Sequence, residues 1–192
     1  MVRRFTDHTS KSRLLPSRQS AYRACHSTET TVLGLHNDLV RSIDNGELSL
    51  LVLLDLSAAF DTVDHSILMT VLSNRFCVEG TALKWFESYL TGRSQTFVYD
   101  GNQTASFSVE CSVPQGSVMG PLCFVSYTEE ITDLFDKHRV QSHMYADDNQ
   151  LYGSCRTEEV NATRDRLLNC TADVARWCAS RRLYSLTLIK LR

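Results

Sequence analysis

The feature that most constrains the fold of this chain is a short apolar run that ends on a carboxylate. Residues 50–54 read Leu-Leu-Val-Leu-Leu, and Asp55 follows them directly. A run this short, without polar alternation, is typical of a strand buried on both faces. An ionised Asp beside such a strand costs several kcal/mol unless a partner charge or a metal ion compensates it. We therefore predict a strand that presents a functional carboxylate at its C-terminal end.

Periodic apolar residues predict several helices around this strand. The predicted helices cover residues 28–43, 61–72, 82–90, 122–134 and 158–180. The first of them should bury one face, made of Val32, His36, Leu39, Val40 and Ile43. Residues 1–18 show no periodicity and are rich in Arg and Lys, so we expect an irregular basic arm there.

Two hairpins are predicted from alternating residues that flank turn sequences. One covers residues 97–113 and turns at Asp100-Gly101. The other covers residues 140–152 and carries Asp147 and Asp148 near its tip. Between the hairpins, residues 113–121 contain two glycines and two prolines, which is typical of a loop whose backbone approaches another group closely.

The composition is that of a globular domain. Of the 192 residues, 43% are hydrophobic and 22% are charged, and no run approaches the ~18 apolar residues of a membrane span. The cysteines are scattered without zinc spacing, which favours reduced thiols in an intracellular protein. The sequence does not distinguish nucleus from cytoplasm, with the nucleus slightly favoured. The net charge is only −2, but basic residues gather at both ends, which would suit a polyanion threaded past a metal site.

The two acidic features need a joint explanation. If their strands are neighbours in one sheet, Asp55 and Asp147 converge, with Asp148 beside them. Three carboxylates this close cannot all stay ionised without cations, and hard divalent ions such as Mg²⁺ prefer oxygen ligands. This chemistry predicts metal-dependent phosphoryl or nucleotidyl transfer. A phosphatase would need much the same acids, so these residues alone leave the substrate open.

Three ordered motifs carry a resemblance to a known family: residues 55–65 (DLSAAFDTVDH), residues 113–117 (VPQGS) and residues 145–148 (YADD). The chain resembles the reverse transcriptase domain of non-LTR, LINE-like (jockey-type) retrotransposons. Residues 19–30 (QSAYRACHSTET) resemble the segment that precedes the first palm motif in those proteins. The resemblance covers residues 14–182, nearly the whole chain.

The resemblance implies an α+β fold, in which a small antiparallel sheet of the polymerase palm type packs on helices, with partial fingers and no thumb. We accordingly divide the chain into a basic arm (1–18), a palm with partial fingers (19–182) and a divergent C-terminal tail (183–192). The implied activity is RNA-directed DNA polymerisation, in which a primer 3′-hydroxyl attacks the α-phosphate of a dNTP on an RNA template. The implied partners are the RNA template, a DNA primer and dNTPs, and no membrane or protein partner is inferable. The alternative is a catalytically inactive remnant that keeps the fold and at most binds nucleic acid weakly.

The resemblance also assigns roles to individual residues. The catalytic acids would be Asp55, Asp147 and Asp148, which with Leu56 would hold two Mg²⁺ ions, for which Mn²⁺ can substitute. The dNTP would lie against Ser57, Ala58, Ala59, Phe60, Gln115 and Gly116. The primer and template would lie against Tyr145, Ala146 and Ser117.

Some motif residues have other or less certain assignments. Phe60 would exclude ribonucleotides, although it could equally be a core aromatic. For Asp61, Asp64 and His65 we expect helix capping and local hydrogen bonds. Lys190 is the candidate general acid that protonates pyrophosphate, although residues 184–190 depart from the Leu-Asn-x-x-Lys-Thr pattern of the family.

Overall fold

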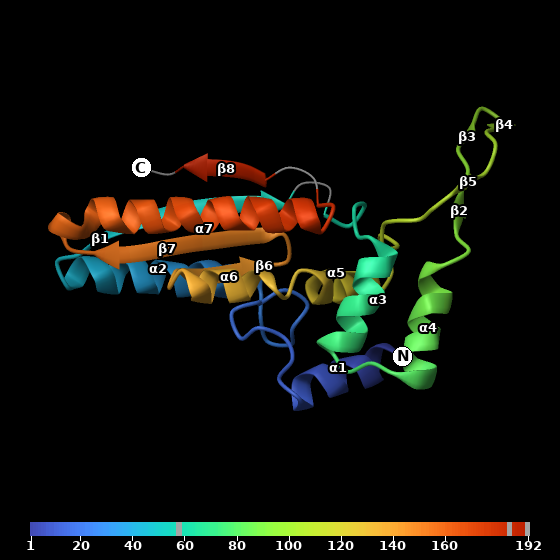
Figure 1. The fold of residues 1–192 in the computed structure, drawn as a ribbon, viewed down its shortest axis with the longest axis horizontal. Helices are drawn as coiled ribbons and strands as arrows, with labels where there is room; N and C mark the ends of the chain where they lie inside the picture. Colours follow the sequence, from blue (N-terminus) through green and yellow to red (C-terminus); the bar gives the residue numbers. More distant parts are fainter. Residues whose placement is uncertain (57–58, 184–185, 191–192) are drawn as a thin grey trace. The chain divides into compact units, whose positions relative to one another are not determined.

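The computed structural model describes residues 1–56, 59–183 and 186–190, the last of these by their backbone alone. The chain divides into two compact units (Figure 1). One unit comprises residues 1–14 and 60–127, and the other comprises residues 15–59 and 128–192. The second unit contains the acidic residues Asp55, Asp147 and Asp148.

The second unit is built on a four-stranded antiparallel sheet with the strand order β6-β7-β1-β8. Its strands are β1 (Leu48–Leu56), β6 (Gln141–Tyr145), β7 (Asp148–Cys155) and β8 (Leu186–Lys190). Its helices are α2 (Thr28–Asp44), α6 (Ile131–Lys137), the 3₁₀ turn η1 (Thr157–Glu159) and α7 (Val160–Ser180). The predicted hairpin over residues 140–152 and the predicted final helix are confirmed.

Helices α2 and α7 cover opposite faces of this sheet. The Tyr152 hydroxyl donates a hydrogen bond to Asp38 of α2, whereas Gly153, the next residue of β7, lies against Thr163 of α7. A Cβ atom at Gly153 would stand 3.0 Å from the Thr163 methyl carbon, so the strand and the helix are packed closely here. Because successive residues of a strand point to opposite faces, the two helices sandwich the sheet.

The predicted buried face of α2 is wrong. The helix buries Thr31, Leu35 and Ser42, while Val32 and Ile43 are 54% and 66% exposed. The cause is a polar contact, since Asp38 accepts hydrogen bonds from Tyr152 and from His143 of the sheet. These bonds turn the Leu35–Asp38–Ser42 side of the helix toward the sheet.

Strand β1 is less buried than the apolar run predicts. Of its residues only Leu54 and Leu56 are fully buried, and both lie on the α7 face. A helix is about 10 Å wide and strands are about 4.8 Å apart, so one helix on each face covers only part of a four-stranded sheet.

The first unit is mainly helical. It contains α1 (Val2–Lys11), α3 (His65–Asn74), α4 (Gly80–Leu90) and α5 (Gly120–Tyr127). The prediction of an irregular arm is wrong for residues 2–11, which form α1. Phe5 is 5% exposed and packs against the rings of Phe76 and Phe86 at centroid distances of 6.0 and 5.4 Å. A single buried aromatic per helix gives too little periodicity to predict the helix from sequence.

Other helix boundaries also differ from the prediction. Helix α3 begins at His65 rather than near residue 61, because the Asp64 carboxylate accepts a hydrogen bond from the Ile67 amide and caps the helix there. Helix α4 begins at Gly80, two residues before the predicted start at residue 82. The run over 122–134 forms two helices, α5 and α6, instead of one.

The predicted hairpin over 97–113 forms, but as two short ribbons. Strand β2 (Ser94–Gln95) pairs with β5 (Phe107–Ser108), and β3 (Val98–Tyr99) pairs with β4 (Asn102–Gln103). Residues 94–108, which we call the arm, extend beyond the end of α4 within the first unit (Figure 1). Across the described residues, no helix is both long and apolar enough to cross a membrane.

Candidate active site

Strand register brings the predicted acids together at one end of the sheet. Asp148 on β7 is paired directly with Asp55 on β1, and with Tyr145 on β6 from its other side. Residues paired directly in antiparallel strands point to the same face with Cβ atoms about 5 Å apart. The strand-end acid and one of the two hairpin-tip acids are therefore neighbours, as predicted.

Asp147 occupies the tight turn beside this row. Its pKa is raised above the ordinary 3.8, chiefly because partial burial disfavours the charged form, and further by the negative charges of Asp148 and Asp55. A hydrogen bond to the backbone of Asp147 offsets part of this rise. The charges of Asp148 and Asp55 thus act on Asp147, and a bound cation would relieve this repulsion.

The donor set fits a hard divalent ion. Carboxylate and carbonyl oxygens are the ligands that Mg²⁺ prefers, and the carbonyl of Leu56 lies one residue beyond Asp55 on the same strand. In the described part of the chain, no three His, Cys, Asp or Glu side chains are already arranged to hold a metal ion. The fit therefore rests on the donor chemistry and on the mutual repulsion of the acids.

Two buried amide side chains hold the backbone of the turn. The Gln19 Oε1 atom accepts a hydrogen bond from the Ala146 amide at 3.0 Å, and its Nε2 atom donates to the Ala146 carbonyl at 3.4 Å. The Asn149 Nδ2 atom donates to the Asp147 carbonyl at 2.8 Å. The Leu56 amide also donates to the Asp147 carbonyl, at 3.4 Å, which ties the turn to β1.

Neither amide residue was singled out from the sequence. Gln19 opens the stretch over 19–30 that resembles the family, but the resemblance gave it no role. The pKa of Tyr22 in the same stretch is raised, chiefly by partial burial and further by the negative charge of Asp147. The resemblance of this stretch to the segment that precedes the first palm motif was the only indication in the sequence.

Several predicted nucleotide-binding residues belong to the first unit and are described within it. Phe60 stacks on Phe124 with a centroid distance of 4.8 Å, as a core aromatic would. The Gln115 side chain donates a hydrogen bond to Asp61 at 2.9 Å. The contacts of these residues with a dNTP stay predictions. The same holds for Ala59, which is buried and belongs to the second unit. Ser57 and Ala58 lie outside the described residues.

The glycine loop has structural reasons for its composition. Gly116 has a φ of +76°, a conformation that glycine adopts without strain, and among the described residues no atom lies within 4 Å of the position of its missing Cβ. The Ser117 hydroxyl donates to the Pro114 carbonyl at 2.6 Å and accepts from the Gly120 amide at 3.0 Å. Ser117 therefore closes the loop at the start of α5, and its predicted contact with primer or template remains a prediction.

Of the motif residues expected to cap a helix or bond locally, only Asp64 does so, because the partners of Asp61 and His65 are Gln115 and Ser112, far along the chain. Asp64 caps α3, and the His65 Nε2 atom is 2.7 Å from the Ser112 carbonyl oxygen, in hydrogen-bond contact. Lys190 is paired with Val52 in the β1–β8 register, while Thr187 is paired with Asp55. The backbone of Lys190 thus lies three residues, or roughly 10 Å, along the sheet from the row of acids.

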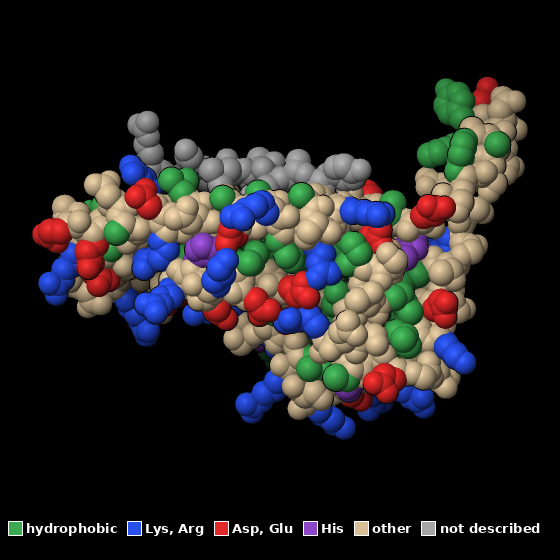
Figure 2. All heavy atoms as spheres, in the orientation of Figure 1, with side chains coloured by type: hydrophobic (Ala, Val, Ile, Leu, Met, Phe, Trp, Pro, Cys, Tyr) green, Lys and Arg blue, Asp and Glu red, His purple; other side chains and the backbone are tan. Residues whose placement is uncertain are grey.

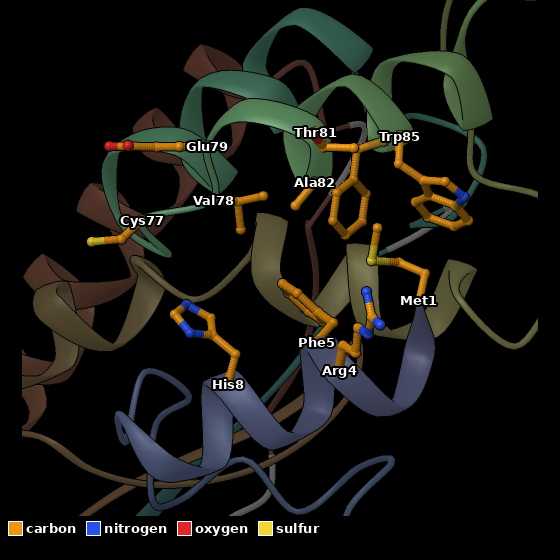
Figure 3. A pocket seen from close by; sticks show the side chains of 11 residues that line it. Met1, Arg4, Phe5, His8, Cys77, Val78, Glu79, Thr81, Ala82 and Trp85 are labelled. Carbon is orange, nitrogen blue, oxygen red and sulfur yellow. The ribbon is translucent and has the colours of Figure 1, made fainter.

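A cavity of about 760 Å³ lies in the first unit, between α1 and the segment 77–86 (Figure 3). Figure 3 shows Phe5 and His8 of α1 on one side, and Val78, Ala82 and Trp85 on the other. None of the three acids lines it. We therefore do not assign this cavity to the acidic site.

Comparisons with known proteins agree with the motifs. A family model described as reverse transcriptase (RNA-dependent DNA polymerase) matches residues 1–187. The chain is 28% identical over 184 residues to the probable RNA-directed DNA polymerase from transposon BS of Drosophila melanogaster. It is 26% identical over 120 residues to the RNA-directed DNA polymerase from mobile element jockey of Drosophila funebris. These matches cover 92% and 62% of this chain, but only 20% and 13% of the relatives, so the chain spans about a fifth of their length or less.

Solved structures share the fold. Telomerase from Candida albicans, in complex with a fragment of telomeric RNA, superimposes with a TM-score of 0.71 over 98% of this chain and 35% of its own, at 13% identity. Telomerase from Candida tropicalis, in a form lacking its C-terminal domain, gives a TM-score of 0.66 over 100% of this chain and 40% of its own, at 12% identity. The expected α+β class, with a small antiparallel sheet packed on helices, and the resemblance to jockey-type elements are confirmed.

Proposed function

The chain belongs to the reverse transcriptase family, and we propose that its acidic hairpin tip is the catalytic centre of an RNA-directed DNA polymerase. The observation that carries this proposal is the register pair of Asp55 and Asp148 with Asp147 in the adjoining turn. Reverse transcriptases use divalent metal ions, and three converging carboxylates are the residues from which such a site would be built. The partners we propose are an RNA template, a DNA primer and dNTPs.

In this proposal Asp55 and Asp147 are the principal ligands of two Mg²⁺ ions, with Asp148 and the Leu56 carbonyl beside them. Bound Mg²⁺ would lower the pKa of the attacking primer hydroxyl and neutralise the charge that develops on the phosphate. The protein residues contribute position and charge: Asp55 on a strand held by neighbours on both sides, and Asp147 in a turn held by buried amides. Manganese would substitute, because Mn²⁺ accepts the same oxygen ligands.

The remaining family positions would select the nucleotide and hold the nucleic acid. Residues 57–60 and the loop at Gln115 and Gly116 would contact the dNTP, with Phe60 placed to exclude a ribose hydroxyl. Tyr145, which shares the register row with Asp148, would support the primer end together with Ala146 and Ser117. Lys190 would be the general acid only if its side chain reaches the acids from a register position opposite Val52.

Primer extension tests the proposal directly. The chain is incubated with a DNA primer annealed to an RNA template, dNTPs and Mg²⁺, alongside the double variant Asp147→Asn, Asp148→Asn. We expect extension by the native chain and a fall of at least about a thousandfold in the variant, because electrostatic stabilisation of the transferring phosphate is lost. The matched control is Asp44→Asn, an exposed carboxylate at the end of α2, which should extend primers like the native chain.

The outcomes separate the activity from its alternative. Absence of extension by native protein that is shown to be folded would contradict the proposal and favour an inactive remnant of the family. Equal extension by the native chain and the double variant would mean that another set of residues is responsible.

A further inference from the structure

The segment that precedes α2 packs along the free edge of the catalytic hairpin. Strand β6 is the first strand of the sheet, and residues 18–20 run beside it in a parallel bridge between Gln19 and Met144. The Met144 amide donates to the Arg18 carbonyl at 3.1 Å, and the Ser20 amide donates to the Met144 carbonyl at 2.9 Å. These two bonds bring Gln19 to the hairpin two residues before its turn.

The Gln19 side chain is fully buried there, at 1% exposure, and all its amide atoms are used. Its Oε1 atom accepts from two backbone amides, those of Ala21 and Ala146, each at 3.0 Å. Because only an oxygen can accept from an amide N–H, these bonds fix which end of the side chain is which. The Nε2 atom then faces the Ala146 carbonyl and donates to it.

The residue that Gln19 holds is in a strained conformation. Ala146 has a φ of +55°, in the left-handed region that disfavours residues with a Cβ atom. Such a conformation persists where surrounding contacts enforce it, and it is often found at functional sites. Ala146 immediately precedes Asp147, so its backbone angles help to set the direction in which the Asp147 carboxylate leaves the turn and the point at which β7 begins with Asp148.

The segment that carries Gln19 is itself fastened by an arginine. The Arg23 guanidinium donates to the carbonyl oxygens of Pro16, Ser17 and Gln19 at 3.0, 3.2 and 3.0 Å. These bonds close residues 16–23 into a compact loop around the buried glutamine. Gln19 is thus anchored independently of the turn that it contacts.

We propose that Gln19 is a positioning residue for catalysis, holding Ala146 in its left-handed conformation so that Asp147 and Asp148 are presented to the metal ions. The proposal rests on the proposed polymerase function for its catalytic consequence. Gln19 touches neither substrate nor metal and acts through the backbone of the turn. Arg23 supports it by keeping the loop closed.

The test compares two variants of Gln19 with a control on the same sheet. Gln19→Leu keeps the approximate volume and removes both hydrogen bonds to Ala146. Gln19→Glu can make the same bonds only while its carboxyl group is neutral, since the ionised form has no donor. The control is Gln141→Leu, at an exposed position of β6. Each protein is measured for kcat and dNTP KM in primer extension, and for amide exchange at Ala146 by NMR.

We expect Gln19→Leu to lower kcat by about tenfold or more, with the KM for dNTP changed less than about threefold, because binding groups are left in place. Exchange at Ala146 should accelerate by at least about tenfold, since its amide loses its acceptor. In Gln19→Glu, the ionised carboxylate still accepts from the Ala146 amide but repels the Ala146 carbonyl oxygen, so kcat relative to the native chain at the same pH should fall as the carboxyl group ionises, while the Ala146 amide stays protected. The control should match the native chain in kcat and in Ala146 exchange at every pH.

Failure of this inference is distinguishable from failure of the proposed function. If the native chain extends primers and Gln19→Leu keeps native kcat, the positioning role is wrong while the polymerase function stands. If the native chain does not extend primers, the polymerase function fails. Unchanged Ala146 exchange in Gln19→Leu would in addition refute the role of Gln19 in holding the Ala146 backbone. Should Gln19→Leu not fold, the fall of kcat in Gln19→Glu relative to the native chain as pH rises decides instead, and a ratio that does not change with pH would refute the positioning role.

Discussion

The two hairpins of this protein use the same local bond in opposite surroundings. In the catalytic hairpin, the Asn149 side-chain amide donates to the Asp147 carbonyl at 2.8 Å, two residues back along the chain. In the arm, the Asn102 side-chain amide donates to the Asp100 carbonyl at 3.3 Å, again two residues back. Asn149 is 1% exposed, whereas Asn102 is exposed to solvent.

The strands that flank the two turns differ in burial in the same way as the two asparagines. Every second residue of β7, on the face toward α7, is buried. The strands of the arm are exposed throughout. Figure 2 shows apolar side chains gathered on the arm, where Phe97, Val98, Tyr99 and Phe107 are 57–86% exposed. The Asp100-Gly101 turn forms because both residues adopt positive φ, as a two-residue hairpin requires. Turn sequence therefore sets local geometry, but burial of the strands decides how rigidly a turn is held.

The largest loss of stability should come from truncating a buried side chain of the catalytic hairpin. Leu151 of β7 is 0% exposed, and Leu151→Ala should lower the free energy of unfolding by about 2–5 kcal/mol, since it leaves a cavity. Val98→Ala in the arm, where the side chain is 69% exposed, should cost less than about 0.5 kcal/mol. Urea unfolding measures both. Comparable losses would mean that the arm is buried in solution and that the contrast between the hairpins is wrong.

A smaller but more specific effect is expected from the paired asparagines. Asn149→Ala leaves the Asp147 carbonyl without its side-chain donor in a buried turn, which should cost about 1–3 kcal/mol. Asn102→Ala removes the equivalent bond where water can replace it, and should cost at most a few tenths of a kcal/mol. Denaturant midpoints of the two variants give the comparison. Equal shifts would show that the local bond, rather than its burial, determines rigidity.

Sequence patterns predicted the elements of the fold better than their faces and partners. The hairpin tip and the strand-end acid were identified because each is a local pattern, and their convergence followed once the strands were assumed to be neighbours. The buried face of α2 was predicted wrongly because Asp38 is turned inward by Tyr152, which lies 114 residues away in sequence. Helix α1 was missed because its one buried aromatic packs against rings more than seventy residues further along the chain.

The supports of the site were missed for a related reason. Gln19 binds backbone atoms of Ala146, so no complementary side chain marks the pair in the sequence. Asn149 looks like an ordinary polar residue of a hairpin until its burial is known. Residues that act on a site through backbone atoms leave little trace in composition or spacing, whereas residues that carry its charge are visible at once.

The acidic turn of the catalytic hairpin should also make the stability of the protein depend on pH. The pKa of Asp147 is raised above 3.8 by burial and by its acidic neighbours. Between 3.8 and the raised value, the folded state holds a proton that the unfolded state has released, so the free energy of unfolding falls as pH rises through this window. Asp147→Asn removes the titrating group. Without divalent ions, the variant should gain stability relative to the native chain across the window and keep a constant advantage above it.

This gain should be the smallest of the three effects, because Asp147 is only partly buried and water screens its neighbours. Thermal unfolding of both chains from about pH 3 to pH 8 measures it, since the difference between them isolates Asp147 from the other titrating groups. Adding Mg²⁺ should abolish the advantage of the variant, because an ion bound to the folded native chain stabilises that state by mass action. A difference that does not vary with pH would mean that Asp147 is not in a negative field. The case for a cation at the hairpin tip would then lose its electrostatic basis.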